Sequence, residues 1–316
     1  MKIYHDIKEF SPVKNAVVTI GTFDGVHIGH QKIIDRLKEV ARQIDGETVI
    51  LTFFPHPRMI LHPEDQSLKM LTTISEKSEL LAQFGIDHLV ITPFTRDFSN
   101  LSPREYVKQV LVQQIGTRRI VIGYDHRFGK DRSGGFTDLL CFGPEYGFEV
   151  EEIPEQDIND VAVSSTRIRN ALFSGKVDAA RDFLGYPFHL TGKVIKGDRL
   201  GRTLGYPTAN LFVAESYKLI PGDGIYAVEA AIPASGEHPA VTYRGMGYIG
   251  NRPTINGMTR NIEVNLFDFN SDIYGQTIRV YFHKFIREDR KFEGLEGLIL
   301  QLDEDKTAAQ DFFSNR

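Results

Sequence analysis

Two histidines near the start of the chain occur in a pattern that suits phosphate chemistry. An apolar run, Ala16 to Ile20, leads into the segment Gly21 to His30, and a helical pattern follows. A strand, a glycine-bearing turn and a helix N-terminus form an anion site, because free backbone N–H groups and the helix dipole point at the ligand. His27 and His30 lie three residues apart and share one face of the first helical turn. We predict that both histidines contact the phosphates of a nucleoside triphosphate.

The turn that carries the histidines supplies further candidate ligand contacts. Gly29 lets the backbone approach a phosphate closely. The other residues that we expect around the nucleotide are Gly21, Phe23, Asp24 and Gly25. The alternative is a pair of ordinary histidines, but this composition predicts a His-x-Gly-His pattern only about 0.03 times. Zinc is a weaker alternative, since the pair has no third ligand nearby.

A second candidate segment, Ser164 to Arg167, opens another helical pattern much later in the chain. Serine and threonine at a helix start normally cap the helix, and this segment alone would be interpreted that way. Together with the histidine motif, its hydroxyls, free N–H groups and guanidinium fit the β- and γ-phosphates of the same nucleotide. The residues with this expected role are Ser164, Ser165, Thr166 and Arg167.

Composition narrows the classes of protein to which the chain can belong. The 316 residues carry a formal net charge of -5 and no Lys/Arg block, so we expect no nucleic-acid partner. The one cysteine, Cys141, excludes an intrachain disulfide and a cysteine-based zinc site. The first residues lack the apolar stretch of a signal peptide, and no apolar run is long enough to span a bilayer. We expect a cytoplasmic protein without a membrane partner, and nothing indicates its oligomeric state.

The first half of the chain alternates β-rich runs with helical stretches, which is typical of a parallel α/β sheet. We expect strands at 16–20, 48–53, 88–91, 119–122 and 148–152. The expected helices cover 31–42, 75–84, 102–114, 166–173 and 177–184, with Ser102 as the N-cap of the third. This pattern predicts an N-terminal α/β domain over residues 1–186.

The second half changes to β-rich runs without helical patterns between them. Residues 224–232, 261–269 and 276–285 are examples, and one helix follows over 295–313. Its apolar stripe is Leu295, Leu298, Ile299 and Leu302. We predict a C-terminal antiparallel sheet or small β-barrel with a terminal helix over residues 187–316.

Six motifs give the chain a close resemblance to a known family. The literal His-Ile-Gly-His sequence also occurs in class I aminoacyl-tRNA synthetases, but their Lys-Met-Ser-Lys-Ser-like loop is missing here. Over nearly its whole length the chain resembles instead the bacterial bifunctional riboflavin kinase/FMN adenylyltransferases, also called FAD synthetases. The motifs that carry this resemblance are Gly21 to His30, Thr52 to Arg58, Gly123 to Gly129, Ser164 to Arg167, Gly201 to Asn210 and Asn261 to Phe269.

For the first half, the resemblance implies a Rossmann-like nucleotidyltransferase domain that joins FMN to the adenylyl group of ATP, forming FAD and pyrophosphate. His27 and His30 would contact the ATP phosphates. The FMN phosphate is already anionic near pH 7, so the step needs positioning and charge-stabilising donors and no general base. Contacts to FMN or adenine are implied for Phe54, His56, Pro57, Asp125 and Arg127.

For the second half, the resemblance implies a β-barrel kinase that phosphorylates riboflavin with Mg-ATP. The 5′-hydroxyl of riboflavin is neutral, so a proton acceptor helps. In the strand at 262–266 the two-residue period puts Glu263 opposite the apolar face, and alone it would be a solvated carboxylate. The resemblance makes Glu263 the base, and Thr208 and Asn210 the oxygen ligands of Mg²⁺. The ATP-binding residues that it implies are Gly201, Arg202, Gly205, Thr208 and Asn210.

The sequence departs from the family pattern at two positions and leaves two rival functions open. His126 stands where the family usually has Phe, and Asn265 where a His is common. One rival is a single-activity adenylyltransferase whose barrel only binds flavin, against which Thr208, Asn210 and Glu263 argue. The other is an adenylyltransferase for another phosphorylated metabolite, such as phosphopantetheine. The expected partners are small molecules alone: riboflavin, FMN and ATP.

Overall fold

Six parallel strands form the sheet of the N-terminal half in the computed structural model. They are β1 (Lys2–Tyr4), β2 (Ala16–Ile20), β3 (Thr48–Phe53), β4 (His88–Thr92), β5 (Thr117–Gly123) and β6 (Glu149–Ile153). Their order is β1-β4-β3-β2-β5-β6, so the chain reverses its direction of travel across the sheet between β2 and β5. The structure describes residues 1–65, 67–154, 163–197, 200–234, 240–250 and 260–315.

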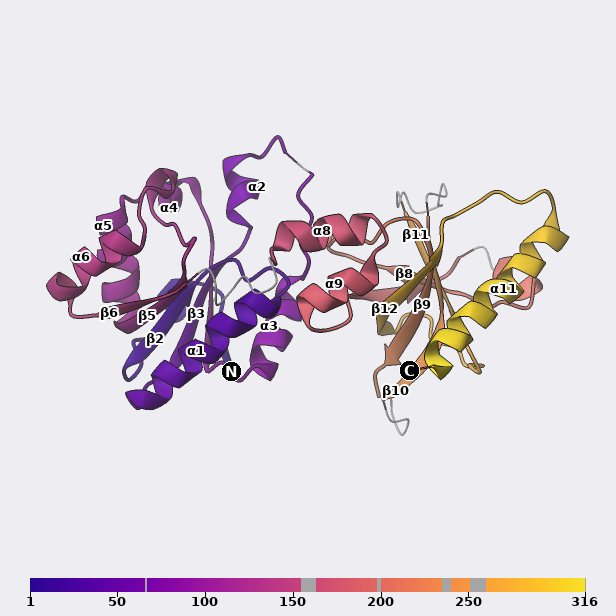
Figure 1. Cartoon of the computed structure of the whole chain (residues 1–316), viewed down its shortest axis with the longest axis horizontal. Coiled ribbons are helices and arrows are strands. Elements are labelled where there is room, and N and C mark those ends of the chain that lie inside the picture. Colours follow the sequence, from indigo (N-terminus) through magenta and orange to yellow (C-terminus); the bar gives the residue numbers. More distant parts are fainter. Residues whose placement is uncertain (66, 155–162, 198–199, 235–239, 251–259, 316) are drawn as a thin grey trace. The chain divides into compact units, whose positions relative to one another are not determined.

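Helices cover the sheet because its central strands are apolar on both faces. All five residues of β2 are buried, and helix α1 packs on β2, β3 and β5 (Figure 1). A second set of helical residues, Tyr106 to Ile115, joins alternate strand residues such as Val18 and Leu51 in one hydrophobic core. The helices of this half are α1 (Ile28–Gln43), α2 (Pro57–Leu61), α3 (Ile74–Gln83), α4 (Arg96–Ser99), α5 (Pro103–Tyr106), a π-helix (Val107–Ile115) and α6 (Phe136–Tyr146).

A closed antiparallel barrel forms the second half. Its strands are β7 (His189–Ile195), β8 (Ala209–Phe212), β9 (Gly224–Ile232), β10 (Val241–Gly250), β11 (Asn261–Leu266) and β12 (Thr277–Arg287), in the order β10-β11-β8-β7-β12-β9. Closure removes the free strand edges that an open sheet would present. The predicted fold class, a parallel α/β sheet followed by an antiparallel barrel with a terminal helix, is confirmed.

Helices α8 (Ser165–Phe173) and α9 (Val177–Leu184) precede the barrel, and α9 packs on β12. By contacts the chain separates into two units, Met1–Ser165 and Thr166–Arg316. Both helices therefore fall almost wholly in the second unit, while the domain boundary at residue 186 stays a prediction. None of the described helices has the length and apolar character that crossing a membrane requires.

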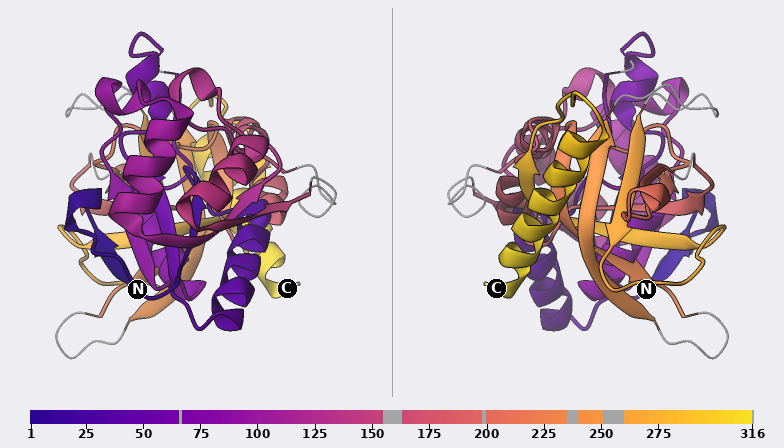
Figure 2. Two further views of the ribbon diagram at one scale, coloured as in Figure 1. Left: turned by 90° about the vertical axis from the view of Figure 1, so that its left-hand side faces the viewer. Right: turned by 90° about the vertical axis from the view of Figure 1, so that its right-hand side faces the viewer.

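The terminal helix α11 (Leu295–Ser314) lies along the outside of the barrel (Figure 2), but its buried face differs from the predicted stripe. Leu295 is exposed, and the buried residues are Gln301, Asp305, Ala309 and Phe313. Asp305 is buried because Arg287 of β12 pairs with both of its carboxylate oxygens at 2.7 Å. The other three residues of the predicted stripe, Leu298, Ile299 and Leu302, are half-buried, and Leu302 packs against the cluster that contains Ala309 and Phe313.

Candidate active sites

Three of the predicted site segments follow three adjacent strands of the parallel sheet. Gly21 follows β2, Phe54 follows β3 and Tyr124 follows β5, and these strands are neighbours in the order β3-β2-β5. The carboxyl ends of parallel strands lie at one edge, and ligands of open α/β sheets bind where the strand order reverses. The sheet therefore brings the segments around His27, His56 and Asp125 to one edge at the reversal between β2 and β5.

The histidine motif is the N-terminus of helix α1. His27 is the N-cap, and the backbone N–H of His30 donates to its Nδ1 at 3.4 Å. Because Nδ1 accepts, the ring proton of His27 belongs on Nε2. The two rings stack with centroids 3.7 Å apart and planes at 17°, and Phe23 packs against His30 with centroids at 4.9 Å. The prediction that the two side chains share one face of the first turn is confirmed.

His30 is an uncharged imidazole at neutral pH. Burial, together with the neighbouring His27 and Lys77, holds the pKa of His30 well below its usual range. Its Nδ1 is buried and has no hydrogen-bond partner among the residues that the structure describes. Such a buried polar atom at a helix start is suited to a polar ligand.

Asp24 is an anchor of the turn. Its carboxylate accepts the backbone N–H of Leu71 at 2.9 Å and that of Thr72 at 3.2 Å, and it is fully buried. The Thr72 hydroxyl in turn accepts the backbone N–H of Gly25 at 3.2 Å. The Ser165 hydroxyl donates to the Asp24 carbonyl at 3.1 Å, which joins the two predicted phosphate segments. The carboxylate thus shapes the site, and its predicted ATP contact stays a prediction.

Five further residues assigned to this site follow β3 or β5 in the first unit. His56 caps α2 by accepting the Arg58 N–H at 3.1 Å, while Phe54 and Pro57 are half-buried beside it. Asp125 and Arg127 are exposed. Thr166 and Arg167 are exposed in the first turn of α8, and their place at the phosphates stays a prediction.

The barrel brings its predicted catalytic residues together between β8 and β11. Glu263 is the register partner of Asn210, and the Thr208 hydroxyl donates to Glu263 Oε2 at 3.2 Å. Asn265 Nδ2 donates to the Pro207 carbonyl at 2.8 Å and is buried. Although Asn265 departs from the family pattern, its side chain holds the turn directly before Thr208.

The segment before Thr208 is a hydrogen-bonded turn. Short helix α10 (Leu200–Thr203) leads into it, and the Tyr206 N–H donates to the Gly201 carbonyl at 2.8 Å. A side chain at Gly201 would have its Cβ 2.3 Å from the Tyr206 carbonyl oxygen, so only glycine fits. The Tyr206 hydroxyl bonds to Asp303 of α11, which ties the turn to the terminal helix. Arg202 and Gly205 are exposed in this turn, and their contacts to ATP stay predictions.

Comparison with known proteins decides the family. A family model for FAD synthetase matches residues 10–167, and a family model for riboflavin kinase matches residues 184–313. A Listeria monocytogenes bifunctional riboflavin kinase/FMN adenylyltransferase is 40% identical over 95% of this chain and 93% of the relative. Relatives of the same name from Escherichia coli (strain K12) and Bacillus subtilis are each 36% identical over 99% of this chain, and over 98% and 96% of their own lengths.

The chain belongs to the bifunctional riboflavin kinase/FMN adenylyltransferase family. The resemblance inferred from the motifs is confirmed. A crystal structure of a Streptococcus pneumoniae protein named macrolide-efflux protein is also similar, at 32% identity over 98% of both chains with a TM-score of 0.87. This likeness supports the fold, and the word efflux belongs to that protein's name alone.

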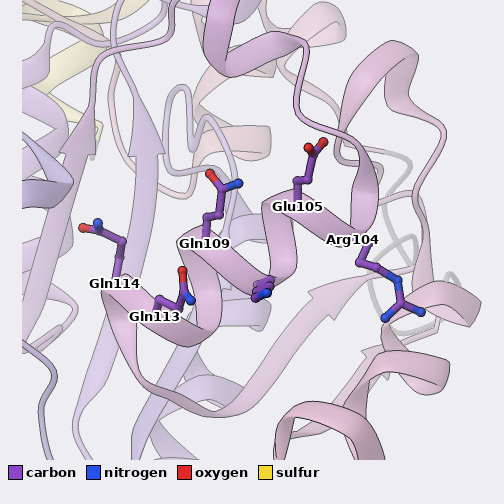
Figure 3. A pocket seen from close by; sticks show the side chains of 6 residues that line it. Arg104, Glu105, Gln109, Gln113 and Gln114 are labelled. Atoms are coloured by element: carbon purple, nitrogen blue, oxygen red, sulfur yellow. The ribbon is translucent and has the colours of Figure 1, made fainter.

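The sequence analysis missed several residues that stabilise these two groups of site residues. None of these residues belongs to a local sequence motif, because each contacts a site segment that is distant in sequence. They are Thr72, Lys77, Tyr206 and Asp303. A groove of about 550 Å³ also runs along α5 and the π-helix, lined by polar side chains (Figure 3). None of its lining residues is assigned to either site; they are Arg104, Glu105, Lys108, Gln109, Gln113 and Gln114.

Proposed function

We propose that residues 187–316 phosphorylate riboflavin to FMN and that residues 1–186 adenylylate FMN to FAD. The observation that carries this proposal is the match of one family model to each half, together with a group of predicted site residues within each half. Riboflavin, FMN and ATP are the substrates that these two activities require. A cytoplasmic location and the absence of a nucleic-acid partner remain predictions from composition.

At the adenylyltransferase site, the FMN phosphate attacks the α-phosphate of ATP and pyrophosphate leaves. The proposed donors to the charge that develops are His27 and His30, supported by the free N–H groups at the start of α1. The uncharged state of His30 fits a donor whose protonation does not change near neutral pH. The residues proposed to hold the outer phosphates are Ser164, Ser165, Thr166 and Arg167. Those proposed to contact FMN or adenine are Phe54, His56, Pro57, Asp125 and Arg127.

At the kinase site, Glu263 is the proposed base. It would accept the 5′-hydroxyl proton of riboflavin while that oxygen bonds to the γ-phosphate and ADP leaves. The Thr208 hydroxyl, directly before β8, and the Asn210 side chain on β8 are neighbours of Glu263 and give a set of hard oxygen donors that fits Mg²⁺. When bound there, Mg²⁺ would neutralise charge on the ATP phosphates.

Isotope labelling tests both activities in one reaction series. The full chain is incubated with riboflavin, MgCl₂ and ATP labelled at either the γ- or the α-phosphate, and the flavins are separated by chromatography. The γ-label should enter FMN and persist in FAD, whereas the α-label should enter FAD alone. Absence of γ-label from both flavins would refute the kinase, and absence of α-label from FAD would refute the adenylyl transfer.

A further inference from the structure

Lys77 is a buried cation to which the proposed chemistry gives no role. It lies in the first turn of α3, where Thr73 and Glu76 form a capping box. Its side chain is 2% exposed, and a lysine is almost never fully buried unless its charge has partners. The partners of Lys77 therefore indicate what the charge does.

The ammonium group of Lys77 holds the turn that leads to the two histidines. Nζ donates to the Thr22 carbonyl at 2.6 Å, and the Thr52 hydroxyl reaches the same oxygen at 3.3 Å. The turn needs such ties, because Phe23 has a φ of 45° and Val26 a φ of 37°, a region that costs a non-glycine residue free energy. Lys77 thus fixes the backbone directly before the strained Phe23, at the start of the turn that also contains Val26.

The charge of Lys77 also acts on the site. Asp24 is close enough to stabilise the ammonium form, and Lys77 adds to burial and His27 in holding the pKa of His30 low. Burial lowers the pKa of Lys77 to about 8, so the ammonium form predominates at neutral pH. A positive charge next to His30 would attract the phosphates that we propose for this turn.

We propose that Lys77 is a positioning residue for adenylyl transfer, which fixes the histidine turn through Thr22 and supplies a buried positive charge beside His30. This inference deepens the proposed adenylyltransferase activity and rests on it. Lys77 acts through the turn and through His30, and it need not touch the substrate. The competing explanation is that Lys77 only stabilises the fold of the first unit.

Two substitutions and one control separate these explanations. Lys77→Met keeps the length of the side chain and removes its charge and its donors, whereas Lys77→Arg keeps both. Lys14→Met removes the same charge from an exposed lysine that pairs with Asp45 at the surface. Each full-length variant is assayed for FAD formation from FMN and for phosphorylation of riboflavin. The pKa of His30 is followed by NMR of the histidine-labelled protein, with its signal assigned through His30→Gln.

Lys77→Met should lower kcat for FAD formation roughly 10- to 100-fold, as expected for a displaced catalytic turn, while riboflavin phosphorylation stays at the wild-type rate. The pKa of His30 should rise when the neighbouring cation is removed. Lys77→Arg should retain much of the activity and keep the pKa low, and Lys14→Met should match wild type in both.

Three results would overturn the inference: unchanged FAD formation in Lys77→Met, a parallel loss of both activities, or an unmoved His30 titration. If Lys77→Met does not fold, Lys77→Gln takes its place, because the amide can still donate to the Thr22 carbonyl while the charge is lost, and FAD formation at the wild-type rate in that variant would overturn the proposed role of the charge. A wild-type enzyme that makes no FAD would instead refute the proposed adenylyltransferase itself.

Discussion

The Thr208 hydroxyl donates to Glu263 Oε2 at 3.2 Å, although 55 residues separate the two in sequence. The bond fixes the orientation of the carboxylate between β8 and β11. With one oxygen bound to Thr208, the other is the one that we assign to the riboflavin hydroxyl proton. The same hydroxyl oxygen of Thr208 is our proposed Mg²⁺ ligand. The Thr208 side chain would therefore contact both the proposed base and the metal ion that binds the ATP phosphates.

Glu263→Gln should abolish most FMN formation and spare FAD formation from added FMN. The amide keeps the shape but cannot accept the proton, and a general base contributes about 10²–10⁴-fold. Initial rates with riboflavin and with FMN measure the two activities separately. The control is Glu288→Gln, an exposed glutamate of the same unit. A kinase rate near wild type in Glu263→Gln would remove this residue from the mechanism.

His27→Ala and His30→Ala should each depress FAD formation and leave riboflavin phosphorylation near normal. Loss of one donor to transition-state charge costs roughly 2.7–4 kcal/mol in comparable sites, and the effect should fall on kcat more than on KM. His→Asn at each position should recover part of the activity, because an amide N–H can still donate.

The control for these histidine variants is His62→Ala, whose side chain is 62% exposed. Wild-type FAD formation in either alanine variant would make that histidine a bystander. A zinc role predicts a different outcome, namely loss of activity with a zinc-selective chelator at saturating Mg²⁺.

Asp24→Asn should destabilise the first unit and weaken ATP binding together. An amide oxygen at the Oδ1 position would still accept the N–H groups of Leu71 and Thr72, but the NH₂ group at the Oδ2 position would face the Leu71 N–H, which now lies 3.0 Å from Oδ2. An unsatisfied buried donor costs about 1–3 kcal/mol. Urea unfolding and the KM for ATP measure the two effects. Weaker ATP binding at unchanged stability would instead make Asp24 a direct ligand contact.

His126→Phe should flatten the pH dependence of stability below neutral pH. Burial, aided by Arg132 and Arg127, lowers the pKa of His126 to about 4. The unfolded chain, with a histidine pKa near 6.5, therefore binds the proton more readily, so stability falls as pH drops from about 7 toward 4. The expected loss by pH 5 is roughly 1–2 kcal/mol.

The measurement for His126→Phe is urea unfolding at pH 7 and pH 5, with His62→Phe as the exposed control. Phe cannot take up a proton, and it removes the buried Nε2, which has no hydrogen-bond partner among the described residues. An equal drop in stability for wild type and His126→Phe would mean that His126 is protonated in the folded protein.

A fragment that starts at residue 166 should be more stable than one that starts at 188, and both should make FMN. The reason is that α8 and α9 belong to the second unit by contact: the Gly222 N–H donates to the Leu172 carbonyl at 2.8 Å, and Leu184 is fully buried. Urea midpoints compare the two fragments. Equal midpoints would show that α8 and α9 contribute nothing to the barrel.

The strands of the first half could be predicted because each is an apolar run bounded by turn residues. The predicted 16–20 and 48–53 coincide with β2 and β3, and the other three predicted strands lie within two residues of β4, β5 and β6. Strand β1 was missed, because its three residues are too few for a recognisable pattern and form a strand by pairing with β4, more than eighty residues later. Helix α6 was missed because it contains Gly143 and Pro144, which disfavour a helix interior.

The site residues that could be predicted are likewise those in local motifs, and those that were missed depend on contacts between segments distant in sequence. Local motifs predicted the pairing of His27 with His30, and the resemblance supplied Thr208 and Glu263 as a pair. Lys77 and Tyr206 could not be found, because their importance comes from burial and from contacts that cross 55 and 97 residues. The predicted helix 102–114 began as expected at the Ser102 capping box, but from Val107 it winds as a π-helix, which periodicity does not reveal.

The bond between Tyr206 and Asp303 sets an order of events during synthesis. Asp303 leaves the ribosome 97 residues after Tyr206, a delay of about 5–20 s at usual rates of translation, so the kinase turn stays untethered for that time. The adenylyltransferase turn is tied much earlier, by Ser165, whose hydroxyl reaches the Asp24 carbonyl, and the last residue that we propose for its site is Arg167. Each nascent chain thus completes the half that consumes FMN before the half that produces it.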